Sequence, residues 1–366
     1  MNSKLEELAK RFEKERKPTY YQDWVRKEGL RIISGHYIYD LRDVELDPWE
    51  RRGGSAVFIN HEDSHNSNDC YICEIPPEGQ LKPQRQLYEE MIYVLDGQGA
   101  TRVWNDAGDK VSFEWHSGSL FAIPLNSWHE HFNTSGKRPA RFISVTNMPV
   151  VMNLFEDDDF VFNTKFDFKS RFSGRSDYYD AKDQPEGFFL DTNFVPDVRT
   201  LKLVNAKERG AGGGHIRFNL ARGTMNSHIS EYPVGTYKKA HRHGPGAHVV
   251  ILSGQGYTLM WPEGEEIKKY PWKEGSMVVP PNLWFHQHFN TGPQPARYLA
   301  LKYEGTAIRN ELGIPKAWIS TKLGGDQLDY SDESTEIRKM FEEELRNNNV
   351  ESKMAPFYAK ELEESS

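Results

Sequence analysis

The feature that most constrains the fold of this chain is an internal repeat. The tripeptide Gly97-Gln98-Gly99 recurs as Gly254-Gln255-Gly256, and Trp104 recurs as Trp261, in both cases 157 residues later. Further pairs keep this offset: Glu74 and Glu231, Pro76 and Pro233, Gly118 and Gly275, His129 and His286, His131 and His288, Asn133 and Asn290. Shared composition does not explain a constant offset between rare residue types, so the chain contains two copies of one structural unit.

Each copy is typical of an all-β fold. Short runs rich in Ile, Val, Tyr and Leu are separated by Gly, Pro and Asn, for example 89–99 and 118–128 in the first copy and 248–256 and 275–285 in the second. Many short strands at this spacing predict sandwich or barrel units, because closing the sheet removes exposed strand edges.

The repeat divides the chain into five parts. We expect an N-terminal helix and lead-in over 1–48, a first barrel over 49–155, a connection over 156–205, a second barrel over 206–310 and a C-terminal helical tail over 311–366. The helices follow from apolar residues at helical spacing. They are Leu5, Leu8 and Phe12 near the start, and Ile337, Met340, Phe341 and Leu345 in the tail.

Composition narrows the classes of partner and compartment. The net charge is -8, and no basic stripe is present, which argues against nucleic acid as a partner. No run approaches the ~18 apolar residues of a membrane span, and the N-terminus lacks the apolar segment of a secretory signal. Cys70 and Cys73 form a single CxxC without a second ligand pair, so we interpret them as buried, reduced thiols. These features predict a cytoplasmic protein without a membrane partner.

The second copy carries a cluster of histidines. His241 and His243 stand two residues apart, which places both imidazoles on one face of an extended segment. His248 follows a Gly-Pro-Gly turn, and His286 lies further along the same copy. Imidazole is the commonest protein ligand for divalent transition metals, so this pattern indicates a metal site.

These residues resemble the motifs of the cupin superfamily, G-x5-H-x-H-x(3,4)-E-x6-G and G-x5-P-x-G-x2-H-x3-N. The matching positions are Gly235, His241 and His243 for the first motif, and Gly275, Pro281, His286 and Asn290 for the second. Two positions depart from the pattern: Leu283 replaces a glycine, and His248 stands where glutamate is expected. The resemblance implies an all-β chain of two tandem cupin barrels, each a double-stranded β-helix or jelly roll, with short terminal helices.

The first copy serves as an internal control for the metal site. The repeat offset places Gln84 at His241, Gln86 at His243 and Met91 at His248, and only His129 remains to match His286. One imidazole and two neutral amides make a poor transition-metal site. We therefore expect a metal-free first barrel, with a weak site on Glu89, Glu90 and His129 as the alternative.

The expected metal ligands are His241, His243, His248 and His286, with substrate contact as the alternative role of His248. The candidate substrate pocket contains His288, Trp284, Tyr257 and Arg297. For His288 and the aromatic residues the alternative is packing in the barrel, and for Arg297 it is a structural role, because Arg141 matches it in the first copy. The remaining histidines receive no functional role: His228 reads as ordinary strand surface, and His36, His61, His65, His116 and His215 fit no spacing.

A site made of neutral imidazoles favours an anionic ligand for the metal, because the charge of the ion is otherwise uncompensated. The chain here is similar to gentisate-type and diketone-type dioxygenases, which hold Fe(II) with histidines alone, whereas oxalate-decarboxylase-type cupins use the motif glutamate. The resemblance thus implies an Fe(II) dioxygenase of a small hydroxylated aromatic or enolisable acid, with Zn, Ni, Mn or Cu as alternative metals. The alternative functions are a non-catalytic metal- or ligand-binding bicupin and a metal-dependent isomerase or hydrolase. Similar bicupins often associate, so a homo-oligomer is also expected.

Overall fold

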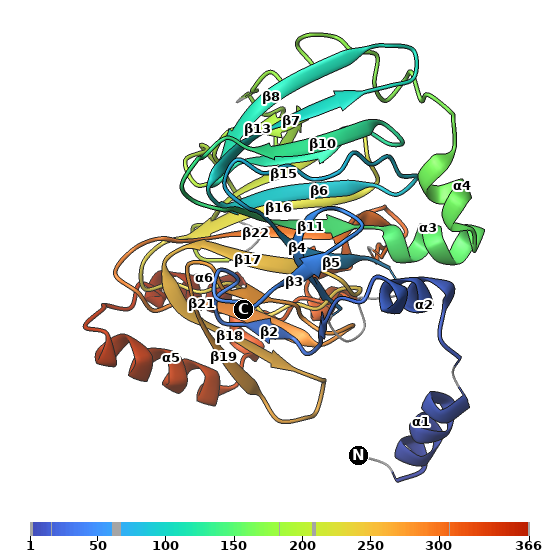
Figure 1. The fold of residues 1–366 in the computed structure, drawn as a ribbon. Coiled ribbons are helices and arrows are strands. Elements are labelled where there is room, and N and C mark those ends of the chain that lie inside the picture. Colours follow the sequence, from blue (N-terminus) through green and yellow to red (C-terminus); the bar gives the residue numbers. More distant parts are fainter. Residues whose placement is uncertain are drawn as a thin grey trace.

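The structure is a computed structural model that describes residues 3–15, 17–60, 67–182, 184–206, 210–306 and 308–364. Two β-barrels lie next to each other, and helices are confined to the ends of the chain and to the connection between the barrels (Figure 1). The prediction of an all-β fold with two tandem barrels and short terminal helices is confirmed.

The first barrel consists of a large and a small sheet. The large sheet runs in the order β1 (Ile32–Ile33), β4 (Gly54–Ile59), β5 (Asp69–Ile75), β11 (Ala140–Thr146), β6 (Glu90–Asp96), β9 (Leu120–Ile123) and β13 (Phe194–Val195), with β3 (Asp47–Trp49) paired to β4. The small sheet contains β10 (Trp128–Asn133), β7 (Gln98–Trp104) and β8 (Lys110–His116).

The second barrel repeats this arrangement. Its large sheet runs in the order β12 (Phe189–Thr192), β15 (Gly214–Leu220), β16 (Met225–Tyr232), β22 (Ala296–Tyr303), β17 (His248–Ser253), β20 (Met277–Val278) and β2 (Tyr37–Ile38), with β14 (Val204–Asn205) paired to β15. Its small sheet contains β19 (Lys268–Lys273), β18 (Gln255–Trp261) and β21 (Phe285–Asn290).

In each copy, the repeat begins before the first matching pair named above, Glu74 and Glu231. β2 precedes β13 by the same offset of 157 residues, and each of these strands pairs with the other copy's barrel: β2 with β20, and β13 with β9. An arginine–aspartate pair follows each strand, with Nε–Oδ1 distances of 2.9 Å for Arg42–Asp40 and for Arg199–Asp197. The two barrels therefore exchange a strand reciprocally.

The two large sheets pack against each other through their outer faces, so both faces of their central strands are buried. This explains the nearly continuous apolar runs of β6 and β17, since a strand buried on both faces has no polar side. Cys70 lies in the core between the barrels and Cys73 inside the first barrel, and both are free thiols. Burial raises the pKa of Cys73 to about 12, which fits the prediction of inert cysteines.

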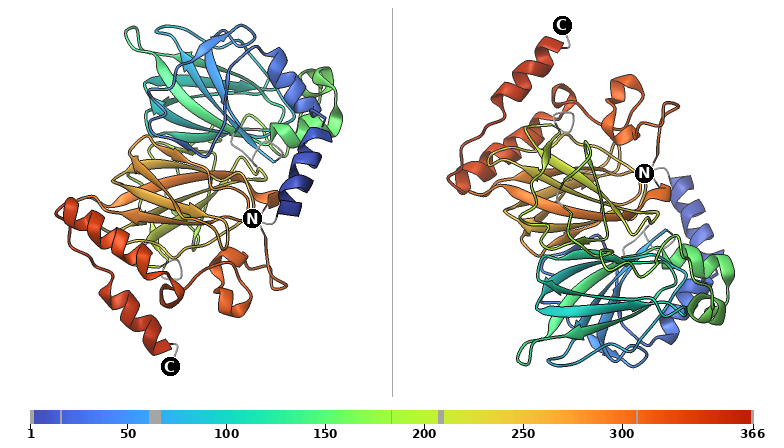
Figure 2. Two further views of the ribbon diagram at one scale, coloured as in Figure 1. Left: turned by 90° about the horizontal axis from the view of Figure 1, so that it is seen from below. Right: turned by 90° about the horizontal axis from the view of Figure 1, so that it is seen from above.

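Helices cover the ends and one side of the barrels (Figures 1 and 2). They are α1 (Ser3–Glu15), α2 (Tyr20–Lys27), α3 (Met148–Phe155), α4 (Asp158–Asn163), α5 (Thr335–Asn347) and α6 (Ala355–Glu364), with 3-10 turns η2 (Glu304–Thr306), η3 (Lys316–Trp318), η4 (Thr321–Leu323) and η5 (Tyr330–Asp332). None of the described helices is long and apolar enough to cross a membrane.

The C-terminal helix α5 lies against the outer face of the second barrel's small sheet. The Ser334 side chain accepts a hydrogen bond from the Glu336 N–H and caps its first turn. Ile337, Phe341 and Leu345 recur at helical spacing and are buried. They share one apolar cluster with Tyr257 of β18, so the helix closes this side of the barrel.

Candidate metal centre

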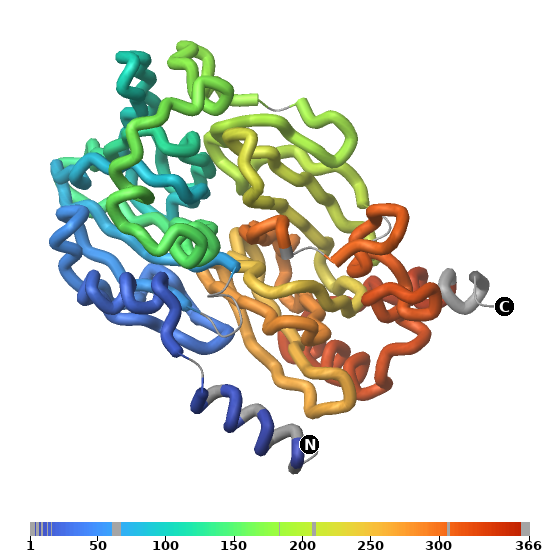
Figure 3. The backbone as a smooth tube through the Cα atoms, turned by 90° about the vertical axis from the view of Figure 1, so that its right-hand side faces the viewer, coloured from blue at the N-terminus to red at the C-terminus, as the bar shows by residue number. Residues whose placement is uncertain are grey.

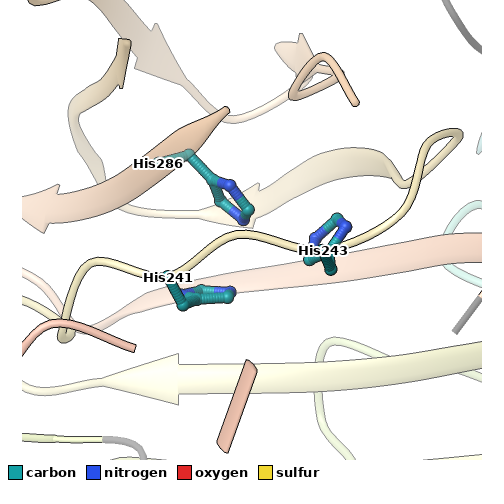
Figure 4. Close-up of side chains that lie close together, drawn as sticks. All are labelled: His241, His243 and His286. Carbon is teal, nitrogen blue, oxygen red and sulfur yellow. The ribbon is translucent and has the colours of Figure 1, made fainter. Parts of the chain in front are cut away.

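The structure brings three of the predicted histidines together in the second barrel. One ring nitrogen from each of His241, His243 and His286 lies within 4.8 Å of the others. The rings converge from two neighbouring chain segments (Figure 4). Reciprocal backbone hydrogen bonds join these segments, at 3.1 Å from the His241 N–H to the His286 carbonyl and 2.9 Å in the other direction. It is the one group of this kind in the described part of the chain.

The backbone around these rings selects the tautomer that a metal needs. Each Nδ1 faces a carbonyl oxygen: His241 that of Lys239 at 3.2 Å, His243 that of Gly244 at 2.7 Å, and His286 that of Trp284 at 3.2 Å. A carbonyl only accepts, so each Nδ1 carries the hydrogen and each Nε2 keeps its lone pair. Three imidazoles held in this tautomer, with one ring nitrogen of each within 4.8 Å of the others, fit a divalent transition metal.

Two turns fix the loop that carries His243. Gly246 has a φ of +87°, and Leu283, at the position where the cupin motif has glycine, has a φ of +60°. The Leu283 N–H donates to the His243 carbonyl at 3.1 Å, which ties the two turns together. The left-handed backbone at this position explains why the cupin motif has glycine there. In this chain the position is occupied by leucine, which is apolar and not branched at Cβ.

His248, the fourth expected ligand, is not in this group. Its neighbours Ala247 and Val249 line the pocket, so His248 on β17 faces the opposite side of the strand. Its Nδ1 lies 3.2 Å from Nδ2 of Asn68 in the first barrel and 3.1 Å from the Gly246 carbonyl. Because the backbone turns between His243 and β17, the side chains of His243 and His248 point to different sides. The spacing of the histidines alone did not predict this.

The pocket that contains the three imidazoles is lined mainly by residues of β15, β16, β17 and β22 and by residues of the segment 308–318. Figure 3 shows the backbone course of the second barrel and of the C-terminal segment that follows it. The remaining lining residues of the pocket include both polar and apolar side chains. They are His215, Arg217, His228, Ala247, Val249, His288, Tyr298, Ala300, Lys302, Glu304, Ile308, Pro315, Ala317 and Trp318.

The sequence alone assigned no function to two of these residues. His215 and His228 face the pocket, and their ring centroids lie 5.0 Å apart. Arg217 pairs in register with His228, and His228 with Ala300, so one row of side chains crosses three strands. Only the strand register decides which face these residues occupy, and the sequence carries no motif for it. His61 and His65 lie outside the described residues.

Among the four expected pocket residues, His288 lines the pocket. The Trp272 indole N–H donates to Thr258 Oγ1 at 3.1 Å, and Thr258 Oγ1 lies 2.8 Å from His288 Nδ1. The Thr258 hydroxyl thus connects the indole of Trp272 to the imidazole of His288. The first barrel contains the same arrangement in Trp115, Thr101 and His131, so this triad is part of the shared framework.

The other three expected pocket residues lie elsewhere. Tyr257 faces α5 on the outer side of β18, because residues alternate between the faces of a strand. Trp284 packs near His36, at 5.7 Å between ring centroids, outside the pocket lining. Arg297 pairs with Glu231 at 2.8 Å and donates to the carbonyls of 198, 199 and 201. It therefore holds the exchanged arm, which is the strand β13 together with the residues that follow it. The expectation of a substrate contact is thereby corrected for these residues.

In the first barrel, the equivalent position contains a row of hydrogen-bonded polar side chains. Gln84 Nε2 donates to Gln86 Oε1 at 3.0 Å, and Gln86 Nε2 donates to Glu90 Oε2 at 2.9 Å. His129 Nε2 lies 3.8 Å from Glu90 Oε2, and burial lowers the pKa of His129 to about 3. Glu89 faces the other way and accepts from Thr224, so Glu89, Glu90 and His129 do not converge.

Comparisons with known proteins agree with this architecture. Residues 71–146 match the family model described as the cupin domain, which spans β5 to β11 of the first barrel. No curated protein sequence matches the chain. Solved structures with a similar course of the chain include three of oxalate decarboxylase from Bacillus subtilis. A deletion mutant has 14% identity, and two others have 15%. One of the latter concerns the Mn(II) centres of that enzyme. Each has a TM-score of 0.48 and covers 74% of this chain and 78% of the other.

The match covers the first barrel, and the repeat extends the assignment. The second barrel has the same order of strands as the first, and it carries the two histidine motifs in which the resemblance was first seen. A cupin domain and its structural copy therefore make up most of the described chain. The chain is a two-domain protein of the cupin superfamily.

Proposed function

We propose that the second barrel binds one divalent transition metal, Fe(II) in the native protein, through Nε2 of His241, His243 and His286. We further propose that the protein is a dioxygenase acting on a small hydroxylated aromatic or enolisable acid. The observation that supports this best is the composition of the ligand group, which consists of three imidazoles and contains no carboxylate among the described residues.

The charge of the site supports an anionic substrate. Three neutral imidazoles leave both positive charges of the ion uncompensated, and a buried cation needs a nearby anion. Arg217 and Lys302 add positive charge to the pocket wall, while Glu304 pairs with Arg217 at 3.4 Å and also with Arg309. A chelating carboxylate, enolate or catecholate supplies the missing negative charge.

The residues of this chain provide the binding and orientation. When bound, the metal supplies Lewis-acid and one-electron chemistry. The Nδ1 hydrogen bonds to backbone carbonyls hold the three imidazoles in place, and His288 is part of the pocket lining beside them. Trp318, Ile308 and Pro315 contribute apolar surface to the pocket lining, which favours a small substrate.

Anaerobic reconstitution tests the proposal. We would load the full chain with Fe(II) and measure oxygen uptake with a panel of hydroxybenzoates, dihydroxybenzoates and β-diketones. Uptake with at least one acid, lost in His241→Gln, is the expected result. Substrate binding without oxygen consumption would indicate the non-catalytic alternative, and turnover without oxygen would indicate an isomerase or hydrolase.

The metal content of the purified protein is the second measurement. One equivalent of iron per chain agrees with the proposal, and one equivalent of another divalent metal that supports the same uptake would correct the choice of metal alone. Failure of every divalent transition metal to bind stoichiometrically would contradict the proposal as a whole.

A further inference from the structure

A buried lysine lies directly behind the pocket of the second barrel. The Lys238 side chain is part of the barrel interior, with 3% of the residue exposed. Its Nζ donates a hydrogen bond to the Tyr298 hydroxyl oxygen at 3.2 Å and lies 4.9 Å from the centroid of that ring. Lysine is seldom buried to this extent in proteins, so its hydrogen bond to a pocket residue is a distinctive feature of this barrel.

Tyr298 connects this lysine to the pocket. The residue lines the pocket, and its ring lies 5.1 Å from that of His288 and 5.9 Å from that of His228. Its hydroxyl oxygen accepts a hydrogen bond from Lys238, and the same hydroxyl group also carries a proton that it can donate. A hydroxyl that accepts from a cation is a stronger donor, because successive hydrogen bonds polarise one another.

The first barrel shows that the fold does not require this pair. Leu81 occupies the position of Lys238: its backbone N–H donates to His131, as that of Lys238 donates to His288, at 2.9 and 3.2 Å respectively. Phe142 occupies the position of Tyr298, with its ring 5.5 Å from that of His131. The barrel that carries three imidazoles thus also carries the polar pair, and the barrel that lacks them has apolar residues at both positions.

We propose that Tyr298, polarised by Lys238, donates a hydrogen bond to an anionic oxygen of the bound substrate. The substrate class is therefore a small acid with at least two oxygen groups, one that chelates the metal and one that meets Tyr298. This inference rests on the proposed function for the metal and adds a second point of recognition on the pocket wall. Tyr298 is the group in contact with substrate, and Lys238 is a positioning residue.

Substitutions that the first barrel already contains provide the test. We would load full-length wild type, Tyr298→Phe and Lys238→Leu with Co(II) and titrate each with oxalate, 2-hydroxybenzoate and 2,5-dihydroxybenzoate, following the Co(II) absorption spectrum. Azide serves as the probe of the metal alone. Both variants should bind at least one of the organic anions about ten- to a hundredfold more weakly, while their affinity for Co(II) and azide stays within about threefold of wild type.

Tyr232→Phe is the matched control. Tyr232 also lies beside Lys238, with its ring centroid 5.6 Å from Nζ, and it is buried but outside the pocket lining. Removing its hydroxyl should leave the affinity for every anion unchanged. An equal loss in Tyr232→Phe and Tyr298→Phe would overturn the inference, since a general disturbance of the barrel would then explain both.

The outcomes separate this inference from the proposed function. If Tyr298→Phe binds every organic anion as tightly as wild type, or if none of them binds Co(II)-loaded wild type, the inference is overturned while the metal site stands. If wild type fails to bind Co(II), the proposed function is contradicted, and the inference falls with it.

Discussion

The two barrels have the same strand order but differ in what fills their interiors at the equivalent position. In the first barrel, Gln84, Gln86 and Glu90 bond to one another, and His129 lies beside them in a space without solvent. In the second barrel, the imidazoles at these positions turn their Nδ1 atoms to backbone carbonyls, and one ring nitrogen of each lies within 4.8 Å of the others. The first barrel fills this position with hydrogen-bonded amide and carboxylate side chains, whereas the second fills it with three clustered imidazoles.

This difference shows how a duplicated fold can divide its roles. The framework that both barrels keep includes the Trp–Thr–His triad and the arginine that holds the exchanged arm, Arg141 in one copy and Arg297 in the other. The residues that differ lie in the interior near the site. Four experiments use the copies as references for each other.

The largest effect is expected from giving the second barrel the residues of the first. His241→Gln with His243→Gln should weaken the binding of divalent transition metals by more than about a thousandfold, because two of three ligands lose their imidazole. Calorimetric titration with Zn(II) or Mn(II) measures this, and the thermal transition should remain close to that of wild type. Retained stoichiometric binding would show that the site lies elsewhere.

A second experiment concerns the buried His129 of the first barrel. Burial, followed by the charge of Arg52, lowers its pKa from 6.5 to about 3 in the folded chain. The unfolded chain therefore binds a proton below about pH 6.5 that the folded chain does not, and the free energy of unfolding falls as the pH drops from 6.5 towards 3. One such group contributes up to about 1.4 kcal/mol per pH unit.

His129→Gln should remove this contribution. Urea unfolding of wild type and variant between pH 4.5 and pH 8 should give curves that converge, or cross, as the pH falls, because only wild type loses the histidine term. A constant difference between the two proteins at every pH would contradict the assignment.

The third experiment tests whether the first barrel supports the metal site of the second. Asn68 Nδ2 donates to the Gly246 carbonyl at 2.7 Å, within the turn that follows His243. Asn68→Ala should weaken metal binding by about tenfold, the usual effect of removing a group that orients a ligand. Asn68→Asp keeps the size and removes the N–H donor, so it should weaken binding as well. Unchanged affinity in both variants would show that the turn holds its shape without this bond.

The smallest effect is expected at the left-handed position that both copies share. Asn126 has a φ of +56° and donates to the carbonyls of Thr164 and Phe166, whereas Leu283 has a φ of +60° with 43% of the residue exposed. Leu283→Gly should raise the free energy of unfolding by about 0.5–1 kcal/mol, because glycine adopts this backbone without strain. Leu283→Ala keeps the strain and should show no gain; equal stability of the two variants would contradict the explanation.

The sequence predicted the architecture well, because the repeat and the alternation of short strands are encoded locally. It also identified His241, His243 and His286, which stand in recognisable motifs. It did not predict that His248 faces the first barrel, since the side that a residue occupies after a turn depends on the backbone of that turn. His215, His228 and Tyr298 belong to three strands that meet only in the folded sheet, so their common face follows from register.

The earlier start of the repeat was present in the sequence but easy to overlook. Asp40-Leu41-Arg42 and Asp197-Val198-Arg199 keep the offset of 157 residues, with two of three residues identical. Because these residues match at the known offset, the repeat also includes the two arms, which consist of β2 and β13 and the residues that follow each strand. Which barrel each arm joins was not predictable, because pairing within one copy and pairing between copies use the same strand pattern.

The reciprocal exchange of β2 and β13 has a consequence for how this chain could be divided. A fragment ending near residue 155 would lack the strand that borders β9, and one beginning near 206 would lack the strand that borders β20. Each half on its own would expose an unpaired edge next to a large apolar face, a combination that promotes aggregation. The pair thus behaves as one interlocked folding unit, and truncation studies should retain both arms.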